Sequence, residues 1–362
     1  MQDEAAFGSA VSIIKRSRMD QKRTEISQVG EFGLIDRISQ SFNPVNQSSL
    51  KGIGDDAAVI DAGDSAIVVS TDMLVEGVHF DLAYTPLKHL GYKSVAVNVS
   101  DIAAMNAKPE QITVSIALSN RFSLEAVDEL YAGIRAACDS FRVDLVGGDT
   151  TSSLTGLIIS ITAIGRAPKH RLAYRSGAKP NDIVCVTGDL GAAFLGLQVL
   201  EREKAVYSTN PDMQPGIEQY EYLVRRFLKP EARMDIVYEL EELNVIPTSM
   251  IDISDGLASE IMHLSRQSGL GFRIFEDKLP METFAYETAA MEFKVDPVTC
   301  ALNGGEDYEL LFTIPQSDFE KVKNHQDIHL VGYVHDKKEN VMVTKQGNVV
   351  PLTAQGWNHF RE

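Results

Sequence analysis

The most constraining feature of this sequence is an apolar hairpin whose strands are flanked by aspartates. Between Lys51 and Asp72 the chain reads KGIGDDAAVIDAGDSAIVVSTD. AAVI and SAIVVST consist of β-forming residues around a DAGD turn, so we predict two paired strands. Such a hairpin carries Asp56 and Asp72 to neighbouring strand ends. Adjacent carboxylates repel each other unless a cation lies between them, and hard oxygen ligands favour Mg²⁺, so the segment predicts a metal site.

Two other interpretations of this segment stay open. GIGDDA matches the G-x-G-x-x-A fingerprint of dinucleotide-binding proteins, but that fingerprint follows a strand and opens a helix. Here polar residues precede it, a hairpin follows it, and Asp55 and Asp56 lie where a pyrophosphate would need uncharged amide donors. The second interpretation is a solvated turn without function, because Asp and Gly are ordinary turn residues.

Length and charge limit the classes of protein to consider. The chain has 362 residues, enough for two domains, and its net charge of −17 argues against nucleic acid or an anionic membrane as the main partner. Cys138, Cys185 and Cys300 lie far apart in apolar sequence, so we expect neither a disulfide framework nor a zinc site. We find no apolar run of the roughly 18 residues that span a membrane and no signal-peptide core. We therefore expect a soluble cytoplasmic protein.

The alternation of predicted elements indicates an α/β fold with a mixed sheet. Thr85 is the expected cap and Asn106 the expected end of a long helix. The other elements expected in this part are strands at 112–119, 143–153 and 156–167 and a helix at 124–141. We expect a flexible extension over residues 1–29, a first domain over 30–166 and a second α/β domain over 167–362.

Further carboxylates lie in positions that suit a metal cluster. Asn98 and Asp101 share one face of the long helix, so Asp101 is a candidate ligand, with a buried capping or bridging role as the alternative. Asp149 follows two glycines at a strand, where backbone amides can approach a phosphate. Asp252 and Asp255 flank a serine in IDISDGL. Asp255 alone is also explained as a helix cap.

The second half predicts a similar alternation of elements. We expect a strand at 183–187, a variable loop at 201–219, and helices at 236–243 and 257–269. Arg175 and Lys179 are the positive charges nearest to the strand. Gly304, Gly305 and Glu306 come immediately before another strand, and Trp357 is the only tryptophan of the chain.

Together these motifs resemble one family from about Gly30 to Phe360. The segments are GIGDDAAVI, STDMLVEGVHF, YKSVAVNVSDIAAM, GGDTT, RSGAKPND, IDISDGL, GGEDYELLFT and GWNHF. In this order and spacing they are similar to the thiamine-monophosphate kinase family, within the wider superfamily of aminoimidazole ribotide synthetase. The VEGVHF loop, GGEDYEL and the aromatic tail favour the thiamine branch over its relatives.

The resemblance implies transfer of the γ-phosphoryl group of ATP to thiamine monophosphate by in-line attack, with several Mg²⁺ ions. It also implies a homodimer whose first domains pair their sheets into a barrel, with active sites between the domains. The implied Mg²⁺ ligands are Asp56, Ser70, Thr71, Asp72, Asp101, Asp149, Asp252 and Asp255. The implied nucleotide contacts are Gly148, Asp149, Arg175 and Ser254. The implied thiamine-phosphate contacts are His79, Glu306 and Trp357.

The chemistry of phosphoryl transfer agrees with this composition. The reaction needs positioning and charge neutralisation more than a protein nucleophile, so no side chain is expected to act as a covalent or general-base catalyst. The chain has no G-x-x-x-x-G-K-[ST] loop, so metal ions on aspartates must supply the positive charge. The alternatives are another ATP-dependent synthetase of the superfamily, a metal-dependent phosphohydrolase, and a non-catalytic protein that binds nucleotides or divalent cations.

Overall fold

The computed structural model describes residues 26–42 and 44–354. The chain divides into two compact units, residues 1–43 with 358–362, and residues 44–357. In the first unit a short 3₁₀ turn, Ile26–Gln28, precedes helix α2, Gly30–Ser39. Trp357 and most of the expected N-terminal extension lie outside the described residues.

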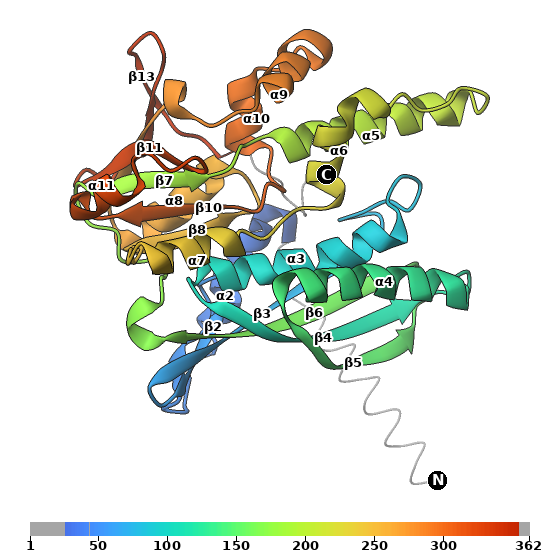
Figure 1. Cartoon of the computed structure of the whole chain (residues 1–362), viewed down its shortest axis with the longest axis horizontal. Helices are drawn as coiled ribbons and strands as arrows, with labels where there is room; N and C mark the ends of the chain where they lie inside the picture. Colours follow the sequence, from blue (N-terminus) through green and yellow to red (C-terminus); the bar gives the residue numbers. More distant parts are fainter. Residues whose placement is uncertain (1–25, 43, 355–362) are drawn as a thin grey trace, which may run out of the picture. The chain divides into compact units, whose positions relative to one another are not determined.

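A six-stranded mixed sheet begins the second unit (Figure 1). Its strands are β1 (Ser49–Lys51), β2 (Ala58–Ala62), β3 (Ser65–Val75), β4 (Lys108–Leu118), β5 (Asp144–Ser152) and β6 (Ile158–Pro168). The strand order is β1-β2-β3-β6-β4-β5, with β4 and β5 parallel and the other pairs antiparallel. The predicted hairpin is confirmed, because Ala62 pairs with Ser65 across the turn between β2 and β3.

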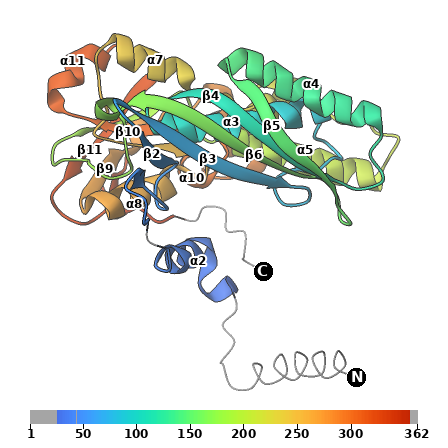
Figure 2. The same ribbon diagram turned by 90° about the horizontal axis from the view of Figure 1, so that it is seen from below.

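Helices α3 (Leu87–Ala104) and α4 (Leu124–Phe141) cover one face of this sheet (Figure 1). The strands alternate accordingly: Ala66, Val68 and Leu74 of β3 are buried toward the helices, whereas Met73 is 55% exposed on the other face. Figure 2 views the sheet from that other face, with β3 and β6 running across it. Alternation of this kind is typical of a sheet with one face in the core.

Two glycines let α3 and α4 cross at close range. A Cβ atom at Gly91 would lie 2.0 Å from the carbonyl oxygen of Leu130, and one at Gly133 would lie 1.9 Å from that of Lys88. Neither contact is sterically possible, so each position needs glycine for the helices to approach. Ser123 begins α4, with its side chain accepting a hydrogen bond from the backbone N–H of Ala126.

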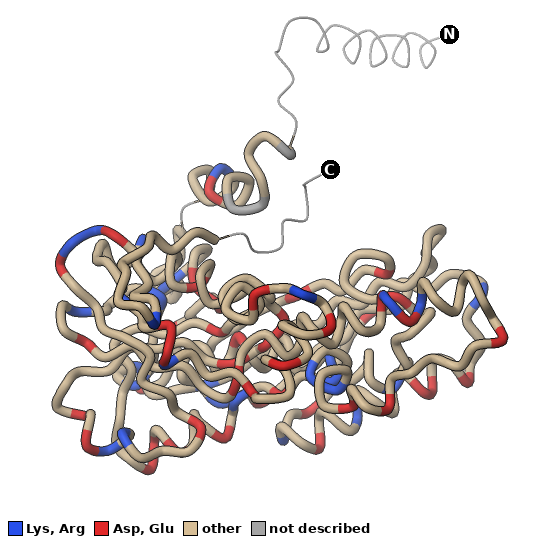
Figure 3. Tube along the Cα trace, turned by 90° about the horizontal axis from the view of Figure 1, so that it is seen from above, with Lys and Arg blue, Asp and Glu red and all other residues tan. Residues whose placement is uncertain are grey.

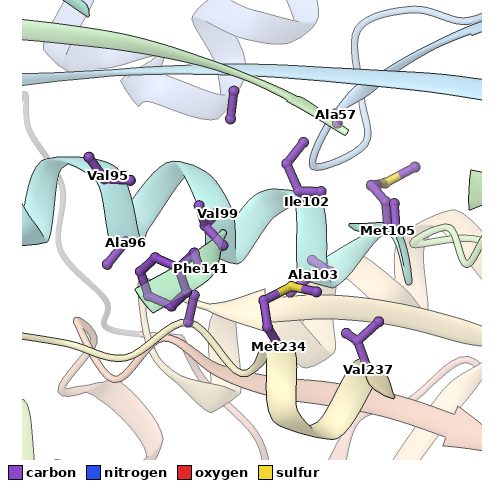
Figure 4. Packing of buried hydrophobic residues seen from close by; sticks show 14 of the residues in the cluster. Ala57, Val95, Ala96, Val99, Ile102, Ala103, Met105, Phe141, Met234 and Val237 are labelled. Carbon is purple, nitrogen blue, oxygen red and sulfur yellow. The ribbon is translucent and has the colours of Figure 1, made fainter. Parts of the chain in front are cut away.

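Helix α3 is buried on nearly all sides because a second layer packs against it. Figure 4 shows Val95, Val99 and Ile102 of α3 in the apolar core that also contains Met234 of α7 (Met234–Glu242). The predicted end of the helix is confirmed, since Asn106 has a φ of 51°. The predicted start is wrong. Pro86 occupies the capping position and has no side-chain cap, and the Thr85 hydroxyl is buried without a hydrogen-bond partner.

The second layer is a seven-stranded mixed sheet in the order β13-β12-β9-β11-β7-β10-β8. Its strands are β7 (Ile183–Thr187), β8 (Ser249–Ile253), β9 (Gly271–Phe275), β10 (Glu309–Ile314), β11 (Ile328–His335), β12 (Val341–Val343) and β13 (Val349–Pro351). The helices of this part are α5 (Ala192–Thr209), α6 (Glu221–Leu228), α7 (Met234–Glu242), α8 (Leu257–Ser268), α9 (Thr283–Glu287), α10 (Pro297–Asn303) and α11 (Phe319–Val322). The α/β fold class and the strand at 183–187 are confirmed.

One predicted loop is partly wrong, because α5 continues to Thr209 instead of ending before Glu201. The residues from Glu201 to Thr209 contain neither glycine nor proline, and the first break of that kind is Pro211. Contacts with other elements also stabilise the extension, since Glu201 accepts a hydrogen bond from the Tyr84 hydroxyl at 2.7 Å. Polarity alone does not end a helix when good helix formers continue it.

The surface is charged, and its charges are mixed. Figure 3 shows acidic and basic residues interspersed along the unit 44–357. Among the described residues, no helix has the length and apolar character needed to cross a bilayer.

Candidate active site

Three carboxylates that are far apart in the sequence converge between the two sheets. Asp56 precedes β2, Asp101 lies in α3, and Asp252 lies in β8, and each offers a carboxylate oxygen within 4.8 Å of the others. Asp72 of β3 belongs to the same site, because it interacts electrostatically with both Asp56 and Asp101. We call these four residues the carboxylate cluster.

Hydroxyl and amide groups from α3 and β3 orient the carboxylate cluster. The Ser70 hydroxyl donates to the Asp101 carboxylate. The Ser100 hydroxyl donates to Oδ2 of Asp252 at 2.6 Å. The Asn98 side chain accepts from the backbone N–H of Asp72 at 3.0 Å and donates to a carbonyl of its own helix, so the polar groups expected inside α3 are satisfied. These contacts fix side chains that would otherwise repel one another.

The cluster carries more negative charge than its surroundings neutralise. Burial raises the pKa of Asp72 to about 6, helped by the nearby Asp56 and Glu306 carboxylates. Burial raises the pKa of Asp252 to about 7, with Asp56 adding to the effect. Burial and the charges of Asp72 and Asp252 raise the pKa of Asp101 well above its ordinary value. All three shifts have the same direction, which indicates a site that favours added positive charge.

Arg175 supplies part of that charge. Its guanidinium group donates to Oδ1 of Asp56 at 2.7 Å, and its backbone N–H donates to Asp55 at 2.6 Å. Lys51 forms an ion pair with Asp55 at 2.7 Å, so Asp55 holds the Arg175 segment while Asp56 faces the cluster. Oδ2 of Asp56 is buried and has no hydrogen-bond partner. An unpartnered carboxylate oxygen among other hard oxygen donors fits a Mg²⁺ ion.

A strained turn before β10 forms another side of the site. Glu306 and Tyr308 have φ values of 62° and 52°, a conformation that costs non-glycine residues about 1–3 kcal/mol each. The backbone N–H of Glu306 donates to the Ser254 carbonyl at 2.7 Å, which ties this turn to the end of β8. Burial and the charges of Glu306 and Asp72 raise the pKa of Tyr308 well above its ordinary value. Tyr308 was not among the predicted site residues, although it belongs to the GGEDYEL motif.

Glu260 of α8 is a buried carboxyl that was also not among the predicted site residues. Glu260 accepts from the backbone N–H of Asp255 at 3.1 Å, and burial with the nearby Asp255 and Asp252 charges raises its pKa well above the ordinary value. Its sequence signal is a glutamate in the apolar stripe of LASEIMHL. The cap interpretation of Asp255 is wrong, because Gly256 occupies the capping position of α8 without a side-chain cap.

Comparison with known proteins identifies the family. A thiamine-monophosphate kinase of Bacillus subtilis (strain 168) is 35% identical over 91% of this chain and 99% of the relative. One of Aquifex aeolicus (strain VF5) is 34% identical over 92% of this chain and 99% of the relative. The chain belongs to the thiamine-monophosphate kinase family. The resemblance of its motifs to that family is thereby confirmed.

Other comparisons agree with this family. Residues 54–167 match the model of the N-terminal domain of AIR synthase related protein. A solved structure described as AaThiL complexed with AMPPCP and TMP superimposes with a TM-score of 0.80 and 31% identity, covering 94% of this chain and 100% of that one. The predicted aminoimidazole ribotide synthetase-like fold is thus confirmed.

Not every residue implied by the family resemblance lies at the carboxylate cluster. Asp72 pairs with Ile161 of β6, Ile161 with Val114 of β4, and Val114 with Gly148 of β5. Three strand spacings separate β3 from β5, roughly 14 Å. Asp149 pairs with Ser115, on the sheet face opposite to the buried Val114. Within one chain, Gly148 and Asp149 therefore lie apart from the cluster.

Thr71, His79 and Gly148 have local structural contacts. The Thr71 hydroxyl donates to the Ile161 carbonyl at 3.0 Å, and the alternation of β3 places it on the face opposite to Asp72. Nδ1 of His79 accepts from the backbone N–H of Val75 at 3.0 Å, in the turn after β3. A Cβ atom at Gly148 would lie 1.8 Å from the Val114 carbonyl oxygen, so strand packing requires glycine there. Each of these three residues therefore has a structural reason to be at its position, independent of metal or substrate binding.

Proposed function

We propose that this protein transfers the γ-phosphoryl group of ATP to thiamine monophosphate, giving thiamine diphosphate and ADP. The observation that carries the proposal is its identity of 32–35% over nearly the whole length of several thiamine-monophosphate kinases. The neighbour described as complexed with AMPPCP and TMP supports ATP as the co-substrate. The carboxylate cluster supplies the type of site that such chemistry needs.

We propose that the cluster holds Mg²⁺, and that more than one ion is present during the reaction. Asp56, Asp72, Asp101 and Asp252 would hold the metal, with Ser70 and Asp255 as further oxygen donors. The unpartnered Oδ2 of Asp56 and the raised pKa values of its neighbours support this assignment. Bound Mg²⁺ would neutralise the charge that develops on the phosphoryl oxygens.

The protein's own groups bind and orient the two substrates in this proposal. Arg175 and Ser254 are the proposed nucleotide contacts, and the Arg175 side chain is 22% exposed beside Asp56. Its guanidinium fork suits phosphate oxygens. The acceptor is itself a phosphate and is largely ionised near neutral pH, so no general base is required. Ser100 and Asn98 of α3 hold Asp252 and the backbone of Asp72 in place through their hydrogen bonds.

The acceptor side of the site is built around Glu306. Its side chain is 29% exposed, so a ligand can reach the carboxylate. Thiamine carries a cationic thiazolium ring, which a carboxylate stabilises. We propose that Glu306 and His79 contact thiamine monophosphate, together with Trp357 outside the described residues.

We also propose that the active form is a homodimer with two domains per chain, residues 30–166 and 167–362. The face of the six-stranded sheet opposite to α3 exposes apolar side chains: Met73 is 55% exposed, and Ile67 and Val69 on the same face of β3 are only partly buried. Pairing of two such sheets into a barrel would bury them. Such a dimer would also explain why Gly148 and Asp149 lie apart from the carboxylate cluster of their own chain. In the dimer, the partner subunit's Asp149 would complete that cluster.

The decisive experiment measures ATP consumption with and without thiamine monophosphate and identifies the products. The proposal requires ADP and thiamine diphosphate in equal amounts, with ATP consumption that depends on the acceptor. A phosphohydrolase would consume ATP without the acceptor, and a non-catalytic binding protein would consume none. Either result would overturn the proposal.

A further inference from the structure

Lys93 is a buried cation whose role the family resemblance does not assign. It lies in α3 and is 3% exposed. Its ammonium group forms an ion pair with Glu306, donates to the Phe227 carbonyl at 3.2 Å, and lies 4.1 Å from the centroid of the Phe227 ring. The same side chain therefore contacts the strained turn before β10 and the end of α6.

Two hydrogen bonds and one aromatic ring face compensate the buried charge of Lys93. A buried ammonium group is costly unless it is paired and hydrogen-bonded. It has three N–H groups, and the Glu306 carboxylate, the Phe227 carbonyl and the Phe227 ring face offer three acceptors. Lys93 is thus committed to protein partners, which favours a positioning role over direct contact with a substrate.

Glu306 is held at several points but remains accessible. Its Oε2 atom pairs with Lys93, and its backbone N–H donates to the Ser254 carbonyl at 2.7 Å. Its Oε1 atom lies 3.5 Å from the Tyr308 hydroxyl, and 29% of the side chain is exposed. One carboxylate oxygen of Glu306 is therefore fixed by Lys93. The Glu306 carboxylate also lies near the carboxylate cluster, because its charge helps to raise the pKa of Asp72.

We propose that Lys93 is a positioning residue for the acceptor substrate, acting by fixing the Glu306 carboxylate in the orientation that receives it. This inference rests on the proposed function and adds a residue to it. A carboxylate on a strained turn that is already oriented loses less freedom when it binds a cationic ligand, so the ion pair raises acceptor affinity. Within the described part of the chain, the hydrogen bonds and ion pair of Lys93 go to Phe227 and Glu306 and not to the proposed nucleotide contacts Arg175 and Ser254, so we expect its removal to affect the acceptor far more than ATP.

The test compares Lys93→Met with Lys108→Met as a control for the loss of a lysine–glutamate pair. Lys108 also joins the first sheet to the second layer, since it bonds to Glu241 at 2.5 Å and lies 5.5 Å from the Tyr238 ring, but this pair is exposed, with 47% of the Lys108 side chain accessible. We expect Lys93→Met to raise the KM for thiamine monophosphate about tenfold, equivalent to about 1.4 kcal/mol, with the KM for ATP within about twofold of wild type. Lys108→Met should leave both KM values unchanged.

A double-mutant cycle separates positioning from direct contact. If Lys93 acts only through Glu306, Lys93→Met combined with Glu306→Gln should be no worse for the acceptor than Glu306→Gln alone. Additive losses would mean that Lys93 contacts the acceptor itself and would overturn the positioning role. If Lys93→Met lowers thermal stability but leaves both KM values unchanged, the ion pair only stabilises the fold and the inference is overturned. Equal increases in KM for both substrates would also overturn it.

Two further measurements keep the outcome decisive. If Lys93→Met does not fold, Phe227→Leu removes the ring beside the ammonium group and keeps the charge. It should then raise the KM for thiamine monophosphate alone, and an unchanged value would overturn the inference. Failure of the wild-type protein to phosphorylate thiamine monophosphate would instead overturn the proposed function, so the two failures are distinguishable.

Discussion

Removing one carboxylate from the cluster should stabilise the metal-free protein while abolishing its response to Mg²⁺. Asp252→Asn is the sharpest variant, because Ser100 can still donate to the amide oxygen that replaces Oδ2. Burial raises the pKa of Asp252 to about 7 from an ordinary value of 3.8. The folded state therefore holds this proton more tightly than the unfolded state. The contribution of Asp252 to the free energy of unfolding is therefore fully present below about pH 4, and it is lost as the pH rises through about 7.

The pKa difference gives the expected size of the effect. The difference between 3.8 and about 7 corresponds to an upper limit of about 4 kcal/mol at pH 8, because the surroundings can relax. For 362 residues, an unfolding entropy of about 2.1 cal/mol/K per residue converts this to about 5 °C in Tm for a cooperative transition. In EDTA at pH 8, Asp252→Asn should thus melt up to about 5 °C above wild type, and the difference should vanish near pH 4.

Thermal unfolding with EDTA and with Mg²⁺ tests both parts of this reasoning. Mg²⁺ should raise the Tm of wild type, because it binds only the folded state, and should barely change that of Asp252→Asn. Asp307→Asn is the control: burial raises the Asp307 pKa to about 7, but the carboxylate accepts from the Gly191 N–H instead of facing the cluster. It should share the gain in EDTA and keep the Mg²⁺ response. An Asp252→Asn protein that is no more stable than wild type in EDTA, or that keeps the Mg²⁺ shift, would refute the argument.

The remaining predictions address catalysis, packing, assembly and the tail. Asp72→Asn should nearly abolish turnover with an unchanged circular dichroism spectrum, and near-normal turnover would contradict the metal site. Gly133→Ala should cost about 3 kcal/mol in urea unfolding, because its Cβ would lie 1.9 Å from the Lys88 carbonyl oxygen. Met73→Lys should shift the sedimentation of a dimer toward monomer, and a wild-type monomer at micromolar concentration would contradict the dimer. Thiamine monophosphate should change the fluorescence of Trp357 in a saturable way, and an unresponsive emission would assign that residue to packing.

Local patterns in the sequence determined much of the fold and part of the site. The alternating apolar strands around DAGD predicted the β2–β3 hairpin, and Asn106 marked the end of α3 because few residues adopt a left-handed conformation as readily. The motifs identified the family, and aspartates at strand ends indicated a metal cluster. All of these signals depend on residues that are close together along the chain.

Only the tertiary structure decided which groups meet. Lys93 is an ordinary helix residue in the sequence, and its pairing with Glu306 depends on how the second layer packs against α3. The burial of Glu260 and Tyr308 was not predicted for the same reason, because distant segments of the chain cover them. Asp149 was grouped with Asp72 by motif, yet the strand order β3-β6-β4-β5 places them three strands apart in one chain. Strand order and layer packing arise from contacts between distant segments, which local propensity does not encode.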